Sequence, residues 1–235
     1  MSLLSTVQAV CAVVGVEVPT SVFTNITYNR TMTEFLALAN ECAQRIAYDT
    51  RDWTKFRKSV TLQGDGVTSA FDLPADFKRM LLKSNVWRST STLEPMKFVP
   101  DTDEWLNRRS MPLTDAWGEW TNMNGQIHIQ PIMGPTVTAY FPYVHKNCIN
   151  LFSGGINDAF MDDRDSFALD ERLLKLCMTW QWKAQKGSPY QEDLSNYGDA
   201  LMQAMGHDSP APIILQGKPY SWGTKVAYPF PVPTP

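Results

Sequence analysis

Apolar residues recur at helical spacing near both ends of the chain and at alternating positions in its middle. At the start, the residues of the helical stripe are Leu3, Val7, Val10 and Val14. Thr31 and Glu34 have the spacing of a capping box, and the stripe that follows them consists of Phe35, Ala39, Cys42 and Ile46. We therefore predict two amphipathic helices, the first ending near residue 15 and the second near residue 50.

The middle of the chain has the alternation and the turn residues of β-strands. We predict one hairpin with strands around 60–62 and 69–71, joined by the sequence Gly64-Asp65-Gly66. A second hairpin is indicated by Asn124-Gly125, a dipeptide typical of tight hairpin turns. Further strands are expected at 80–87 and 136–144, and a short helix is expected from Asp101.

The stretch from Phe167 to Gly187 predicts a helix that is apolar on two sides. Its main stripe is centred on Leu173 and also contains Leu169, Leu176, Cys177, Trp180 and Ala184. Met178 and Trp182 lie on the opposite side of a helical wheel. Either the helix is wedged between the core and the β-rich segment, or Met178 and Trp182 contact a neighbouring subunit. We place these two residues at a subunit interface.

A last helix is indicated by Ser188, Pro189 and Gln191, which suit an N-cap, a first helical position and a capping-box partner. Its stripe is formed by Leu194, Tyr197, Leu201 and Met205. The predicted class is α+β. We expect a helical bundle made from residues 1–55 and 146–207, a central antiparallel β-rich insert at 56–145, and an extended C-terminal strap at 208–235.

The strap has an unusual composition, with seven prolines and four large aromatic residues from Asp208 onward. Proline stiffens an extended chain and lowers the entropy lost when that chain is ordered on a partner. We therefore expect the aromatic residues to anchor the strap on a partner protein. These anchors are Tyr220, Trp222, Tyr228 and Phe230.

Charge and composition narrow the function classes. The net charge is −3, which argues against tight electrostatic binding to duplex DNA. No stretch reaches the ~18 apolar residues of a membrane span, so no membrane contact is expected. The four cysteines form no C-x-x-C pair and are interpreted as reduced residues of an intracellular protein.

No sequence motif of known chemistry is present. Phosphate-binding and dinucleotide-binding glycine loops are missing, and so is a G-x-S-x-G elbow. The acidic run from Asp158 to Glu171 does not fit a calcium loop, because Phe167 and Ala168 occupy positions that need an oxygen ligand and glycine. Its acids are better explained as side chains that complement the partial positive charge at the start of a helix. His145 is expected at the surface, and we predict no metal, cofactor or catalytic site.

The order of elements resembles that of the head-to-tail adaptor proteins of tailed bacteriophages, also called head-completion or connector proteins. The resemblance rests on FDLPADFKRM at 71–80, FALDERLLKL at 167–176 and the Y-x-x-x-L spacing of the last helix. The F-x-L-P-x-D-F pattern at 71–77 is typical of such phage proteins. As a pattern of elements, the resemblance covers most of residues 1–206.

The resemblance implies a structural protein of the virion, located at the head–tail interface and assembled in the host cytoplasm. Free monomers would form a homo-oligomeric ring, usually a dodecamer, beneath the portal protein after genome packaging. The ring would extend the DNA channel, let DNA pass without sequence-specific binding, and dock the downstream tail protein. The aromatic strap is assigned to portal binding.

Charge is divided unevenly along the chain. Residues 51–97 carry nine Lys or Arg against five acids, and residues 158–171 carry six acids against one Arg. Each subunit of a cyclic ring uses two different surfaces. We therefore hypothesise that these segments face each other between neighbours, with Asp162 and Asp163 at the subunit interface.

Two other functions stay open. One is a phage tail or baseplate hydrolase acting on cell-wall polymer, for which Asp115 and Glu119 are a nominal carboxylate pair. The other is a different ring component of the tail, such as a terminator, whose partner would be the tail tube and not the portal.

Overall fold

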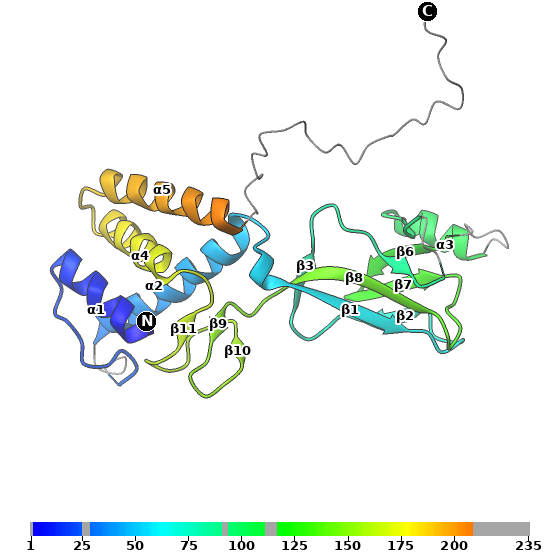
Figure 1. The fold of residues 1–235 in the computed structure, drawn as a ribbon, viewed down its shortest axis with the longest axis horizontal. Coiled ribbons are helices and arrows are strands. Elements are labelled where there is room, and N and C mark those ends of the chain that lie inside the picture. The colour runs from blue at the N-terminus through cyan, green and yellow to red at the C-terminus, as the bar shows by residue number, and fades with distance from the viewer. Residues whose placement is uncertain (1, 25–28, 91–93, 111–116, 209–235) are drawn as a thin grey trace, which may run out of the picture.

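The fold is that of a computed structural model, which describes residues 2–24, 29–90, 94–110 and 117–208. Within them the chain is of the mixed α+β class, with five α-helices and three sheets, as predicted at that level. Figure 1 shows a helical lobe and a β lobe side by side along the long axis. Both lobes contain their own core of buried apolar residues.

The helical lobe is built from both ends of the chain. Its helices are α1 (Leu3–Val14), α2 (Arg30–Gln44), α4 (Glu171–Gln185) and α5 (Gln191–Asp208). The second continues as one π-helical segment, η1 (Arg45–Asp49). The central helix is α4, which packs against each of the other three. A small sheet of β9 (Ile149–Asn150), β10 (Ile156–Asn157) and β11 (Ser166–Phe167) adds to the same lobe, with β9 in the middle.

The caps explain where the first two helices begin and end. Ser2 and Ser5 form a reciprocal capping box at the start of α1, and Gly15 ends that helix in a left-handed conformation at φ 73°. At α2 the cap lies earlier than the sequence indicated. Asn29 accepts a hydrogen bond from the backbone N–H of Thr31 at 2.9 Å, so Thr31 lies inside the first turn.

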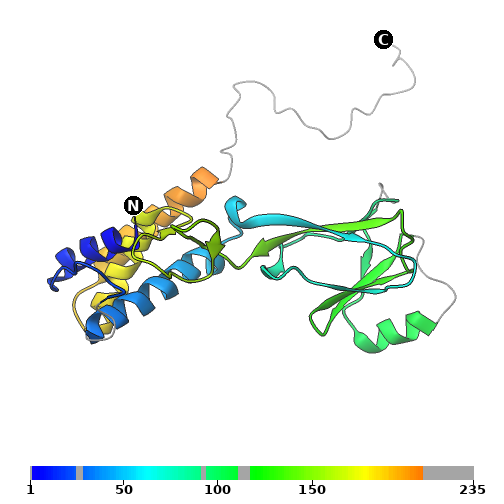
Figure 2. The same cartoon turned by 90° about the horizontal axis from the view of Figure 1, so that it is seen from below.

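Two sheets form the β lobe. The first contains β1 (Arg57–Gln63), β8 (Thr138–His145) and β3 (Phe77–Met80) in that order, and β4 (Trp87–Arg88) also pairs with β8. The second has the order β2 (Ala70–Asp72), β7 (Gln126–Gln130), β6 (Glu119–Met123), β5 (Lys97–Phe98). Helix α3 (Thr102–Ser110) is the green helix below the strands of this lobe in Figure 2.

The sequence predicted one hairpin correctly and one wrongly. Strands β6 and β7 pair antiparallel around Asn124-Gly125, as expected. The segments on either side of Gly64-Asp65-Gly66 do not pair with each other, because β1 pairs with β8 and β2 pairs with β7. Gly64 instead allows the backbone of Gly134 to approach closely, because a Cβ atom at position 64 would lie 2.4 Å from the carbonyl oxygen of Gly134.

The chain passes between the lobes twice, through the short helix η2 (Thr54–Phe56) into β1 and again at the end of β8. Contacts across the junction tie the lobes together. Asp52 forms an ion pair with Arg79 of β3 and accepts the backbone N–H of Leu82 at 3.2 Å. The ammonium group of Lys78 lies 4.9 Å from the ring centre of Tyr48.

His145 lies at the same junction and is buried, at 5% exposure, so its expected surface position is wrong. Its ring meets the ring of Phe56 edge to face, with centroids 5.5 Å apart. Burial lowers the pKa of His145, with the nearby charge of Lys58 acting in the same direction and Asp76 opposing it. The neutral imidazole therefore belongs to the packing between the lobes.

Candidate interaction surfaces

Helix α4 buries the two residues that were expected at a subunit interface. Met178 is completely buried and Trp182 is 6% exposed. The ring of Trp182 stacks on Phe35 of α2, with centroids 4.1 Å apart and planes at 12°. The ammonium group of Lys186 lies 4.5 Å from the same indole. Neither side chain is available to a neighbouring subunit, so the interface assignment of Met178 and Trp182 is wrong.

The reason is the number of helices that surround α4. Because α1, α2 and α5 all pack against it, apolar side chains are needed on most of its circumference. Even Trp180, which is half-buried, has a place within the chain: the guanidinium of Arg45 lies 5.5 Å from its ring centre, and Tyr190 and Tyr197 lie beside it. The helix is therefore surrounded by helices of its own lobe, and it is not wedged between the core and the β-rich segment as the alternative expectation had it.

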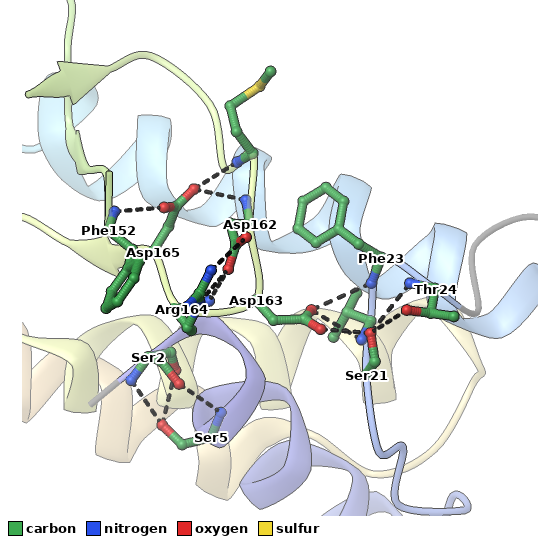
Figure 3. A network of polar contacts seen from close by, with 12 residues as sticks. Ser2, Ser5, Ser21, Phe23, Thr24, Phe152, Asp162, Asp163, Arg164 and Asp165 are labelled. Atoms are coloured by element: carbon green, nitrogen blue, oxygen red, sulfur yellow. Dashed lines mark hydrogen bonds and ion pairs between the residues drawn. The ribbon is translucent and has the colours of Figure 1, made fainter. Parts of the chain in front are cut away.

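The acidic run at 158–171 organises the loops next to the start of α1 (Figure 3). Asp165 is 1% exposed, and its carboxylate accepts three backbone N–H groups, from Phe152 at 2.9 Å, Met161 at 2.7 Å and Asp162 at 2.8 Å. Its own carbonyl oxygen accepts the N–H of Leu3 at 2.8 Å. The buried carboxylate thus fixes the loop, and the backbone carbonyl of the same residue holds the first helix against it.

Asp163 extends this arrangement to the segment between α1 and α2. Its carboxylate accepts the backbone N–H groups of Val22 at 2.9 Å and Phe23 at 3.2 Å, and the hydroxyl of Ser21 at 2.5 Å. Its carbonyl oxygen accepts the N–H of Leu4 at 3.0 Å. Asp163 therefore bonds within its own chain, and its assignment to a subunit interface is not supported by the geometry.

Asp162 is the acid of the pair that remains partly accessible. Its carboxylate lies 3.0 Å from the guanidinium of Arg164, and the side chains are 46% and 61% exposed. The side-chain hydrogen bond from Arg164 lowers the pKa of Asp162. Arg164 also lies over the ring of Phe152, 3.9 Å from its centroid.

The expectation that acids of this run lie at a helix start holds for Asp170, which is the N-cap of α4.

An exposed apolar patch surrounds this acidic loop. We call it the loop patch, and it consists of Phe152, Ile156 and Met161, which are 61%, 39% and 65% exposed. The three side chains border a hollow of about 510 Å³ that Asp162 and Arg164 also line. Sequence reasoning missed this patch, because single apolar residues in a glycine-rich loop have no period. Exposed apolar residues gathered on one rigid loop are typical of an interaction surface.

The carboxylate pair considered for hydrolysis does not form a described site. Glu119 is 1% exposed and is held in an ion pair by Arg108, and Asp115 lies outside the described residues. Among the residues that the structure describes, no group of three His, Cys, Asp or Glu side chains could hold a metal ion. All four cysteines are free and buried. No described helix is long and apolar enough to cross a membrane.

The assigned portal anchors lie outside the described residues. They are Tyr220, Trp222, Tyr228 and Phe230. No protein-family model matches the chain. A search of curated proteins gives no match either.

Proposed function

We propose that the chain is a structural protein that joins the portal of a tailed bacteriophage to its tail. The observation that carries the proposal is the two-lobed architecture of Figure 1: both chain ends build one helical lobe, and the β lobe projects from it through two adjacent chain crossings. The resemblance to head-to-tail adaptors implies this combination of a helical bundle and an inserted β domain. The buried ion pair of Glu119 weakens the hydrolase alternative.

In this proposal the chain forms a homo-oligomeric ring of about twelve copies, as the resemblance implies, and DNA passes through the centre. The helical lobe contacts its neighbours and the portal, and the β lobe points toward the tail protein. The loop patch replaces Met178 and Trp182 as the candidate subunit contact, because Phe152 and Met161 are exposed and lie beside Asp162. The aromatic strap at 208–235 is the candidate portal contact.

The test is a mass measurement of the purified chain, alone and after mixing with emptied heads that contain the portal. We expect a monomer alone and a ring bound to the heads, with no binding to heads that lack the portal. A chain ending at Asp208 should stay folded and bind no heads, because both described cores precede that residue. Binding to isolated tails and not to heads would instead indicate a terminator, and binding to neither would refute the proposal.

A further inference from the structure

Strand β1 has one open edge from Ser59 onward, whereas the N–H of Arg57 at its start donates to the carbonyl of Thr54. In the described structure it pairs only with β8, and the register places Ser59 opposite Pro142. Proline has no N–H, and the carbonyl of Pro142 accepts the N–H of Leu81 at 3.5 Å, on the other side of β8. The pair Ser59–Pro142 is therefore one of the non-hydrogen-bonded pairs of an antiparallel ladder.

The alternation of hydrogen-bonded and non-hydrogen-bonded pairs determines which backbone groups of β1 point outward. Even-numbered residues bond to β8, as the N–H of Gly64 does with the carbonyl of Val137 at 3.0 Å. The N–H and C=O groups of Ser59 and Thr61 consequently point away from the sheet, and no described backbone or side-chain group bonds to them. The side chains of both residues are exposed, so the edge is not covered by the described chain.

The edges formed by β2, β3 and β5 carry protections that proteins use against unwanted pairing, whereas the charges of β1, Arg57 and Lys58, are confined to its start. Strand β3 is four residues long, has an irregular register between Phe77 and Arg79, and places Lys78 and Arg79 on its edge. Strands β2 and β5 contain three and two residues. From Ser59 to Gln63, β1 contains no charge, proline or bulge. A long regular edge without such features is a site where another strand adds.

We infer that the open edge of β1 is covered by residues 213–216 of the same chain, with the sequence Ile-Ile-Leu-Gln, added as a parallel strand. The observation that selects this occupant is the place where α5 ends. The carboxylate of Asp208 accepts the backbone N–H of Thr54 at 3.2 Å and lies 3.3 Å from the guanidinium of Arg51. Three residues after Thr54, β1 begins, and Figures 1 and 2 both place the end of α5 beside this point.

The reach of the chain fits this position. Ile213 is five positions after Asp208, and five extended residues span about 17 Å. Ser59 is five positions after Thr54, and η2 shortens that path, so five extended residues after Asp208 are enough to bring Ile213 beside Ser59 when the two segments run in the same direction. The segment 213–216 is uncharged and aliphatic, and the prolines at 210, 212 and 219 lie outside it. Proline cannot donate to a sheet ladder but is tolerated at a strand's start.

Strand addition by residues 213–216 goes beyond the proposed function and does not depend on it.

The experiment is residue-resolved amide hydrogen exchange on the full chain. The inference predicts that the amides of Ser59 and Thr61 are protected, although the described ladder leaves them unpaired. In the full-length Ile214→Pro variant, these two amides should exchange faster by on the order of tenfold, because their hydrogen-bond partners are displaced. The amides of Val60 and Leu62 bond to β8 and should be unchanged, which makes them an internal control within the same strand.

Thr224→Pro is the matched control, since it adds a proline to the strap outside the proposed strand. It should leave Ser59 and Thr61 as protected as in the parent chain. Unprotected Ser59 and Thr61 in the parent chain would overturn the inference, and so would protection that survives Ile214→Pro. Protection that falls when the protein is diluted would assign the added strand to a second copy and overturn the same-chain assignment.

Discussion

Replacement of Asp165 by alanine tests whether the acidic run is structural. The carboxylate of Asp165 is buried and accepts three backbone N–H groups from two turns of the chain. The substitution removes all three bonds at once. It also leaves the part-buried N–H groups of Phe152, Met161 and Asp162 without their partner.

The magnitude follows from these contacts. A hydrogen bond to a charged group contributes about 1.5–3 kcal/mol net, which gives an upper bound near 9 kcal/mol for three of them. The loop lies at the surface, so water can reach some of the freed groups after local relaxation. We therefore expect the free energy of unfolding to fall by about 3–5 kcal/mol, a large share of the ~5–15 kcal/mol of a typical domain.

Urea unfolding followed by tryptophan fluorescence measures this loss. With a slope of about 2–3 kcal/mol per molar urea, the midpoint should fall by roughly 1–2 M. Asp158→Ala is the matched control, because this acid of the same run is exposed, and its cost should stay within about 0.5 kcal/mol. If Asp165→Ala unfolded at the parent midpoint, the carboxylate would not organise the loop, and a binding role for the acids would have to be reconsidered.

Two further predictions concern the helical core and the junction. Trp182→Ala should lower the free energy of unfolding, measured in urea, by about 3–5 kcal/mol, because it opens a cavity against Phe35. Trp182→Phe keeps an aromatic ring at this position and should lower that free energy clearly less. An equal loss in the two variants would contradict the stacking. Burial lowers the pKa of His145 in the folded chain. As the pH falls below about 6.5, the imidazole is therefore protonated in the unfolded chain before it is protonated in the folded chain. The free energy of unfolding consequently decreases between about pH 6.5 and the lower pKa of the folded state. Urea midpoints from pH 7.5 to 5 should therefore fall less in His145→Gln than in the parent, and parallel curves would exclude the contribution of this histidine.

The elements that the sequence predicted well are those whose signals are local. The end of α1 at Gly15, the acids at the start of α4 and the turn at Asn124-Gly125 involve groups within a few residues of each other. The predicted hairpin at Gly64-Asp65-Gly66 failed because pairing in a sheet is not local. Gly64 looked like a turn residue, but its missing Cβ makes room for Gly134, seventy residues later.

The candidate site was harder to predict, for a related physical reason. A helical wheel shows which residues of α4 share a side, but not how many neighbours the helix has, so the buried side of Trp182 looked free. The acids at 163 and 165 gave a second ambiguous signal. A carboxylate that accepts backbone N–H groups from distant loops has the same sequence pattern as an exposed acid, and only the path of Ser21–Phe23 and of Phe152 past these acids reveals the difference.

The junction between the lobes gives the proposed adaptor a specific mechanical property. Two chain crossings alone would let the β lobe swing relative to the helical lobe. Contacts on both sides of the crossings oppose such motion: the ion pair of Asp52 with Arg79 on β3, and the packing of Phe56 against His145 of β8. Because the carboxylate of Asp52 is only 10% exposed, its ion pair is screened less than an exposed pair, and the rings of Phe56 and His145 are buried. A ring built from such subunits would hold its β lobes at a fixed height, which a docking surface for the next tail component requires.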